Sequence, residues 1–244
     1  NLTVAAEYST YTRNVDTRSE AWHPYRHWKS KRGDWDTVIT FNYDLVLESL
    51  MVEGSAIDST SFILPKRSGY RAKHTMPIIK LHGSVNWGVS QGGEVEIVGD
   101  IEDFIDRTDV RPLIATPGAT KTSYCNKHLL SLWNAAADAL REAEVIVFLG
   151  YRFPPSDSEA REKLLRPIAE NKTDVLKVHT VLGPKVHDDP TARLTGLLQH
   201  TLEGAGRTQG SGPGATHHYR IFNEPLYVED FLSVVKSPPL RATR

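Results

Sequence analysis

The sequence predicts a Rossmann-like α/β fold, in which a mainly parallel sheet carries helices on both faces. Short apolar runs typical of buried strands alternate along the chain with segments of helical periodicity. Polar residues or glycine follow several of these runs directly, as they do where parallel strands end at a ligand crevice. The 244 residues suit one α/β domain, or one domain with an insertion.

In the first half of the chain, strands are expected over residues 37–41 and 77–81. Residues 1–30 form a polar and aromatic leader that we expect to pack on the sheet. Asp44 stands where a helix would begin after the first strand. Residues 52–76 show little periodicity, and two interpretations stay open for them, a lid over the site or a disordered loop.

The second half shows the alternation most clearly. Residues 126–142 place apolar side chains on one helical face. The run EVIVFL at 144–149 is typical of a strand that is buried on both faces of a sheet. Ser156 and Glu159 have the spacing of a capping box and predict that a helix starts there. A further strand is expected over residues 175–182.

The remaining segments complete the expected fold. They are a hairpin or excursion over 92–105, an extended run over 111–117, a glycine-rich loop over 204–215, a last strand over 219–222, a closing helix over 228–235 and a frayed tail over 237–244. We see no internal repeat, and we treat residues 1–244 as a single domain.

Composition argues against several classes of protein. The formal net charge of −1 does not favour a nucleic-acid surface, so no direct nucleic-acid partner is expected. No apolar run approaches a membrane span and no signal-peptide pattern opens the chain, so we expect a cytoplasmic protein without a membrane partner. The single Cys125 excludes an intramolecular disulfide and a cysteine-only zinc site, and we expect no metal.

Two short stretches that follow predicted strands carry the candidate catalytic side chains. Thr40–Asp44 (TFNYD) supplies Asn42 and Asp44, and Lys80–Asn86 (KLHGSVN) supplies His82. We expect the three side chains to converge at one crevice, where they could orient a ligand, stabilise a cation and move a proton. Each also has a structural interpretation: a turn residue, a helix N-cap and a hydrogen-bonded core histidine.

The same stretches resemble known motifs. TFNYD resembles the TxNxD motif of the sirtuins, and LHG resembles their His-Gly motif. Gly150–Asp157 (GYRFPPSD) resembles a GY-x-x-P-x-x-D segment that belongs to the SIR2-like (sirtuin-like) domains of bacterial defence proteins. The resemblance covers roughly residues 36–160. It implies a set of cofactor-binding residues: Thr40, Gly83, Gly150, Tyr151, Arg152 and Asp157.

The resemblance implies hydrolysis of the nicotinamide–ribose bond of NAD+, giving nicotinamide and ADP-ribose, in anti-phage defence. NAD would be the substrate, zinc would not be needed, and a homo-oligomer or other defence subunits would be partners. Asp44 would hold the nicotinamide carboxamide or stabilise the oxocarbenium-like centre. Asn42 would place the water or the ribose hydroxyls, and His82 would be the general base.

Two alternatives remain open. One is an NAD-dependent protein deacylase or ADP-ribosyltransferase; the deacylases of the family usually carry a four-cysteine zinc module, which a chain with one cysteine lacks. The other is a non-catalytic module that binds nucleotides or partner proteins.

The chain also departs from the family pattern. Arg152 stands where the family commonly has serine, and it could clamp a phosphate or block the pocket. The family's GAG loop does not precede residue 36, and the GAG at Gly204–Gly206 lacks the flanking strand and helix, so we expect an amino-terminally truncated domain. Lys121 is either a match to a family lysine or a solvated side chain, and Asp157 is either a sugar-hydroxyl acceptor or part of a helix cap.

Overall fold

The structure is a computed structural model, and it describes residues 15–33, 35–50, 76–99, 104, 106–115, 123–154, 157–185, 189–210 and 217–235. The proposed lid, Lys121, Ser156 and the carboxyl-terminal tail lie outside the described residues, apart from Met76 at the end of the lid segment. The chain divides into two compact units, Asn1–Asn134 with Ser237–Arg244, called unit 1, and Ala135–Lys236, called unit 2.

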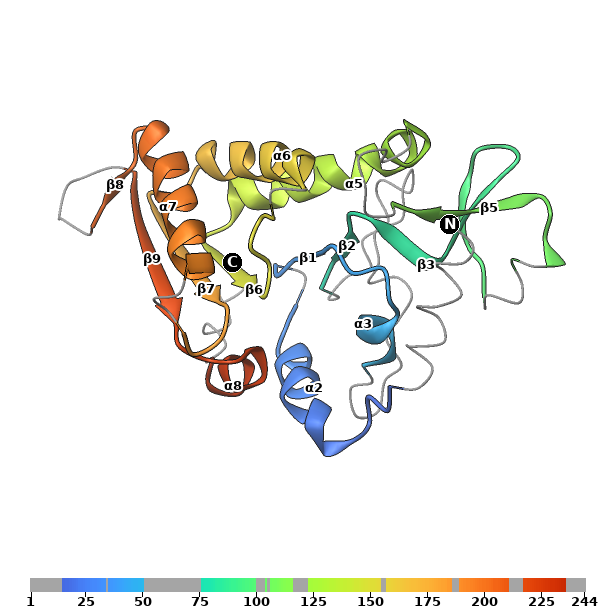
Figure 1. The fold of residues 1–244 in the computed structure, drawn as a ribbon, viewed down its shortest axis with the longest axis horizontal. Coiled ribbons are helices and arrows are strands. Elements are labelled where there is room, and N and C mark those ends of the chain that lie inside the picture. The colour runs from blue at the N-terminus through green and yellow to red at the C-terminus, as the bar shows by residue number, and fades with distance from the viewer. Residues whose placement is uncertain are drawn as a thin grey trace, which may run out of the picture. The chain divides into compact units, whose positions relative to one another are not determined.

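Unit 1 combines a parallel strand pair with a small antiparallel sheet (Figure 1). Its elements are the 3₁₀ helix η1 Glu20–Trp22, α2 His23–Ser30, β1 Val38–Thr40, α3 Val46–Ser49, β2 Ile78–Lys80, β3 Gly83–Ser90, β4 Val95–Ile97, β5 Val110–Ile114 and the first part of α5 Ser123–Glu142. Strands β1 and β2 pair in parallel, with Val38 opposite Ile78 and Thr40 opposite Lys80. The two strands expected in this half of the chain are therefore confirmed as neighbours.

The antiparallel sheet of unit 1 has the order β4-β3-β5. Its central strand β3 was not expected, because its sequence GSVNWGVS mixes glycine and polar residues with apolar ones. The segment expected to form its own hairpin instead contributes β4 to this sheet, in antiparallel pairing with β3. One core cluster of unit 1 includes residues of β3 and β5: Val85, Val98, Phe104, Val110 and Ile114, with Tyr43 and Leu45 packed against it.

Unit 2 is built on a four-stranded sheet of order β6-β7-β9-β8 in which every pairing is parallel (Figure 1). Its elements are the end of α5, β6 Val145–Leu149, α6 Ser158–Ala169, β7 Val175–Val181, α7 Asp189–Gly204, β8 Thr208–Gln209, β9 His218–Glu224 and α8 Val228–Val234. Helices α6 and α7 connect successive parallel strands, as parallel pairing requires. The fold is therefore α/β with a mainly parallel sheet, consistent with a Rossmann-like architecture.

Helices lie on both faces of the unit 2 sheet. Thr195 of α7 donates a hydrogen bond to Asn223 Oδ1 at 3.0 Å, and Thr180 of β7 donates to the same oxygen at 2.7 Å. Consecutive strand residues point to opposite faces, so His179 lies on the other face. There its ring is 6.2 Å from the ring of Phe231 in α8.

Strand β6 differs from its expected environment. Alternate side chains of its apolar run are exposed, with Val145 at 48%, Val147 at 40% and Leu149 at 37%. The expectation that this strand is buried on both faces was wrong. The strand lies at one edge of the sheet, and an apolar run does not reveal whether a strand is central or at an edge.

The first residues of helices α5 and α6 also differ from expectation. Helix α5 begins at Ser123, three residues earlier than the apolar periodicity indicated. Helix α6 begins at Ser158, so Glu159 is its second residue and not the third position of a capping box. The Glu159 carboxylate accepts from Lys163 Nζ at 2.6 Å, one turn further along the helix.

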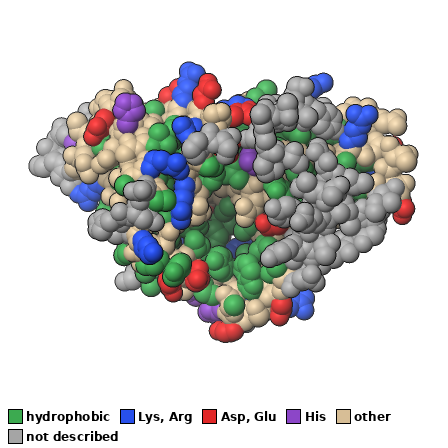
Figure 2. Space-filling model, in the orientation of Figure 1, with side chains coloured by type: hydrophobic (Ala, Val, Ile, Leu, Met, Phe, Trp, Pro, Cys, Tyr) green, Lys and Arg blue, Asp and Glu red, His purple; other side chains and the backbone are tan. Residues whose placement is uncertain are grey.

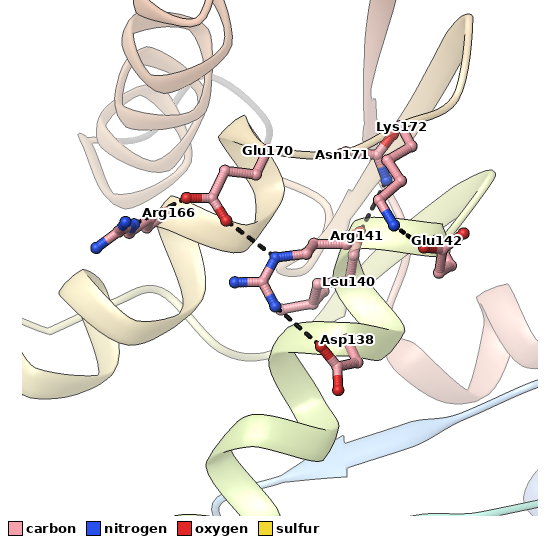
Figure 3. A network of polar contacts seen from close by, with 8 residues as sticks. All are labelled: Asp138, Leu140, Arg141, Glu142, Arg166, Glu170, Asn171 and Lys172. Atoms are coloured by element: carbon pink, nitrogen blue, oxygen red, sulfur yellow. Dashed lines mark hydrogen bonds and ion pairs between the residues drawn. The ribbon is translucent and has the colours of Figure 1, made fainter.

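Side-chain contacts join the ends of α5 and α6 within unit 2 (Figure 3). Arg141 donates to Asp138 and to Glu170, both at 2.9 Å, and Arg166 donates to Glu170 at 2.8 Å. The buried amide of Asn171 donates to the carbonyls of Leu140 at 2.7 Å and Ala143 at 2.9 Å, which satisfies backbone acceptors at the end of α5. The exposed ion pairs are screened by water, so the Asn171 bonds carry more of the stabilisation.

Figure 2 shows Lys and Arg side chains next to Asp and Glu side chains at several places on the visible face. Among the described helices, none has the length and apolarity needed to cross a membrane.

Candidate functional site

The carboxyl ends of β1 and β2 carry the two sequence stretches singled out above. Thr40 and Lys80 are paired at the ends of these parallel strands, and Leu81 N–H donates to the Thr40 carbonyl at 2.9 Å. Asn42 and His82 each lie two residues beyond this pair. The two turns therefore leave the same edge of one parallel pair, which is the arrangement that their strand-end positions predicted.

The His82 ring is half-buried and lies beside an aromatic wall. Its centroid is 5.0 Å from that of Phe41, at an interplanar angle of 67°. Phe41 also lies 6.2 Å from the ring of Trp133 in α5. The His82 carbonyl accepts from Ala115 N–H at 2.9 Å, so the backbone of the histidine is fixed to the segment that follows β5.

The turn that follows β1 is held by its own side chains. Asn42 is exposed, and its N–H donates to Thr40 Oγ1 at 3.0 Å. The half-buried Asp44 accepts from Val46 N–H at 3.0 Å through Oδ1, at the start of α3. Asn42 thus lies in a turn, as its structural interpretation expected. Asp44 bonds to the first residue of α3, but the N-cap position is Leu45, one residue later, and no side chain caps the helix.

A buried charged cluster beneath this turn was missed from the sequence. The Lys80 side chain is 1% exposed, and its ammonium donates to Glu48 Oε1 at 2.6 Å, to Ser84 Oγ at 2.9 Å and to the Asp44 carbonyl. Burial lowers the pKa of Lys80 and raises the pKa of Glu48, while their pairing acts on each pKa in the opposite direction. A lysine between Ile79 and Leu81 in a buried strand was the available signal, because such a lysine needs a partner.

A second lysine approaches the same carboxylate from α2. Burial lowers the pKa of Lys29 to about 8, and the charge of Glu48 opposes this shift. The Lys29 Nζ atom and the Glu48 Oε2 atom are both buried without a hydrogen-bond partner among the described residues. Unit 1 therefore holds two ammonium groups near one carboxylate.

Gly83 has a structural reason to be glycine. Its φ is +80°, and a Cβ atom built on it would lie 2.0 Å from the carbonyl oxygen of Leu113 in β5. The sequence suggested that this glycine lets a ligand approach the backbone. In the structure, the backbone that comes close is that of the neighbouring strand β5, in which Ile114 is paired with Gly83.

The other predicted cofactor-binding residues follow β6 in unit 2. Gly150 has φ +70° and donates its N–H to the Val181 carbonyl at 3.0 Å. The Tyr151 hydroxyl donates to the buried Asp157 carboxylate at 3.0 Å, and burial followed by the Asp157 charge raises the pKa of Tyr151. Asp157 lies at the N-cap position of α6, as the cap interpretation expected, but its side chain makes no capping hydrogen bond.

Three arginines surround the backbone of this β6–α6 loop. Arg152 donates to the Leu182 carbonyl at 3.3 Å, and Arg193 donates to the Arg152 carbonyl at 3.4 Å. Arg161 donates to the carbonyl of Phe153 at 3.4 Å, while its Nε atom is buried with no hydrogen-bond partner among the described residues. Phe153 itself is 1% exposed and has φ +48°, an uncommon value for a residue with a side chain. The loop is thus anchored and rich in cations.

The predicted site residues fall into two groups, one in each unit. Unit 1 holds Thr40, Asn42, Asp44, His82 and Gly83, and unit 2 holds Gly150, Tyr151, Arg152 and Asp157. Within the described part of the chain, no cluster of three or more His, Cys, Asp or Glu side chains could hold a metal ion.

Comparison with known proteins identifies no family for this chain. No family model matches the chain, and no curated protein matches it. The class that the fold defines is an α/β protein with a mainly parallel sheet.

Proposed function

We propose that this chain belongs to an NAD+ hydrolase that cleaves the nicotinamide–ribose bond and releases nicotinamide and ADP-ribose. The observation that carries the proposal is the parallel pairing of β1 with β2. Because of this pairing, the Asn42 turn and the His82 turn begin at the same carboxyl edge of the strand pair. An exposed amide and a half-buried imidazole at such an edge are suited to positioning water and accepting its proton.

Each residue of unit 1 has a role in the proposed reaction. His82 is the general base that deprotonates the attacking water, and Phe41 limits the orientations of its ring. Asn42 places the water or the ribose hydroxyls. Asp44 stabilises the oxocarbenium-like centre or holds the carboxamide, through the carboxylate oxygen that Val46 does not occupy. Nicotinamide leaves as a neutral molecule, so no acid is needed for its departure.

In unit 2 we propose the β6–α6 loop as the cofactor-binding segment. Gly150, Tyr151 and Arg152 are the contacts, and the cations around the loop favour a phosphate. Asp157 acts through Tyr151, because its carboxylate already accepts the tyrosine hydroxyl. The wider proposal is a cytoplasmic enzyme of bacterial anti-phage defence that acts as a homo-oligomer or with other defence subunits, without a zinc ion.

A non-catalytic nucleotide-binding module is the second candidate. It is favoured by the intrachain bonds of three predicted site residues, since Thr40, Asp44 and Asp157 each have a side-chain oxygen engaged within the chain. Such a module would bind a nucleotide and leave it intact.

The test is NAD+ loss, measured by chromatography, with purified protein that contains this chain. His82→Ala and Asn42→Ala should each lower turnover by about 100- to 10,000-fold, since a positioned acid–base group contributes that much. His200→Ala is the matched control, because His200 is exposed on α7, and it should keep full turnover. Circular dichroism checks that all variants are folded. Full turnover in folded His82→Ala and Asn42→Ala would contradict the proposal, and nucleotide binding without turnover in the unsubstituted protein would favour the second candidate.

A further inference from the structure

The strongest feature that the proposed reaction does not use is the buried ammonium of Lys80. This group reaches three elements at once: the Asp44 carbonyl before α3, the Glu48 carboxylate within α3, and Ser84 Oγ at the start of β3. With a side chain that is 1% exposed, it cannot serve as a surface charge. Its three donors are directed to three acceptors, which is the full capacity of an ammonium group.

The charge of Lys80 is balanced locally. Glu48 lies 2.6 Å away and is itself mostly buried, with a side chain that is 21% exposed. The other charged groups that act on this carboxylate are Lys29 from α2 and Asp44 from the turn. A buried lysine with a paired carboxylate is retained at a cost in desolvation, so its specific contacts need an explanation.

Those contacts fix the turn that carries the proposed catalytic residues. The Tyr43 carbonyl accepts from Val85 N–H of β3 at 2.9 Å, and Ser84 Oγ lies 3.5 Å from the same carbonyl. The Asp44 carbonyl is held by Lys80. Two successive carbonyls of the Asn42–Asp44 turn are therefore tied to the segment that contains His82.

We propose that Lys80, paired with Glu48, is a positioning residue that holds the Asn42–Asp44 turn in register with the His82 turn. The positioning is a property of the fold and stands without any reaction. Its consequence for turnover rests on the proposed function.

The test requires a variant that removes the bond to Asp44 without leaving an isolated buried charge. Lys80→Met alone leaves the Glu48 carboxylate buried without its partner, which is strongly destabilising. The double variant Lys80→Met with Glu48→Leu replaces the pair by apolar side chains of similar volume, which a fold tolerates much better. It is made in a Lys29→Met background and compared with that background, because the buried Lys29 ammonium would otherwise lose the charge of Glu48. The matched control is Lys163→Met with Glu159→Leu, because that pair in α6 has the same 2.6 Å separation.

The first readout is amide hydrogen exchange in the whole protein. Exchange of Val46 and Val85 should be about 10- to 100-fold faster in the Lys80 double variant, since a hydrogen bond to a charged group holds the turn that both amides join. Leu81 N–H, which donates to Thr40 between paired strands, should keep its protection and is the internal reference. The control pair should change none of the three. Unchanged exchange of Val46 and Val85 in the folded double variant would overturn the proposal.

The second readout is NAD+ turnover. A displaced turn should lower kcat by about 10- to 100-fold with little change in KM, because small displacements of catalytic groups act on the reacting geometry. If the unsubstituted protein does not hydrolyse NAD+, the proposed function fails while the exchange measurement still decides the role of Lys80. A third outcome is that the unsubstituted protein hydrolyses NAD+ and the double variant keeps that turnover despite faster exchange. Lys80 would then position the turn, but the register of the turn would not affect the reaction. That result overturns the functional half of the proposal.

Discussion

Replacing Gly83 by alanine distinguishes a glycine required by the fold from one required by a ligand. The residue has φ +80°, and the added Cβ would lie 2.0 Å from the Leu113 carbonyl oxygen and 3.0 Å from its carbonyl carbon. Ordinary carbon–oxygen contacts are about 3.3–3.6 Å, so β3 and β5 would have to separate by more than about 1 Å at this point. Backbone atoms cannot move aside as a flexible side chain can.

The expected loss of stability has two parts. A side chain in the left-handed region costs about 1–2 kcal/mol. Separation of the strands also weakens the adjacent bond from Ala115 N–H to the His82 carbonyl, and a disrupted buried bond costs about 1–3 kcal/mol. We therefore expect Gly83→Ala to lower the free energy of unfolding by about 2–5 kcal/mol, the sum of these ranges.

Gly93→Ala is a matched control for the backbone conformation. Its φ is +79°, and a Cβ built there has no atom within 4 Å, so only the conformational cost of about 1–2 kcal/mol applies. Urea denaturation followed by circular dichroism measures both variants. Equal losses in the two would show that the Leu113 backbone does not require the glycine, and the interpretation as a site of ligand approach would then gain support.

Two further predictions concern buried polar groups. Lys29→Met should raise the free energy of unfolding at pH 7 by about 1 kcal/mol, because a buried ammonium without a hydrogen bond is removed. The gain should shrink above pH 8. Because the pKa of Lys29 is lowered from 10.5 to about 8, the folded unsubstituted protein binds fewer protons than the unfolded chain between these values, and its stability rises with pH there. The exposed Lys31→Met is the control, and a gain that does not vary with pH would contradict the argument. Tyr151→Phe should lower the free energy of unfolding by about 1–3 kcal/mol, because it removes the hydrogen bond from the tyrosine hydroxyl to the buried Asp157 carboxylate. In thermal denaturation Tyr227→Phe, at a side chain that is 57% exposed, should change little, and an equal effect of both substitutions would refute the role of the Asp157 bond.

The sequence predicts β1, β2 and α5 well, because each has a pattern of apolar residues within its own segment. The runs before Asn42 and His82 predicted β1 and β2, and the apolar periodicity after Cys125 predicted α5. Strand β3 has no such pattern, since its glycines and polar residues are placed by pairing with β4 and β5 on either side.

The candidate site shows the same division between local and distant information. Strand-end placement predicted that the Asn42 and His82 turns leave one edge. Lys80 pairs with Glu48, 32 positions away. The position of Lys80 in a buried strand indicates that it needs a partner, but nothing in the sequence indicates that the partner is Glu48. The close approach of the Leu113 carbonyl to Gly83 also joins residues far apart in the sequence, so the glycine could be noticed from the sequence but its cause could not.

The division into two units also gives the protein an internal optical probe. All five tryptophans, at positions 22, 28, 35, 87 and 133, lie within Asn1–Asn134. Trp87 and Trp133 are buried at 1% and 4% exposure, so their emission should change when unit 1 loses its packing. Unit 2 contributes tyrosines but no tryptophan to the spectrum. Comparing tryptophan emission with the far-ultraviolet signal of all helices during denaturation therefore shows whether the two units unfold in one transition or in two.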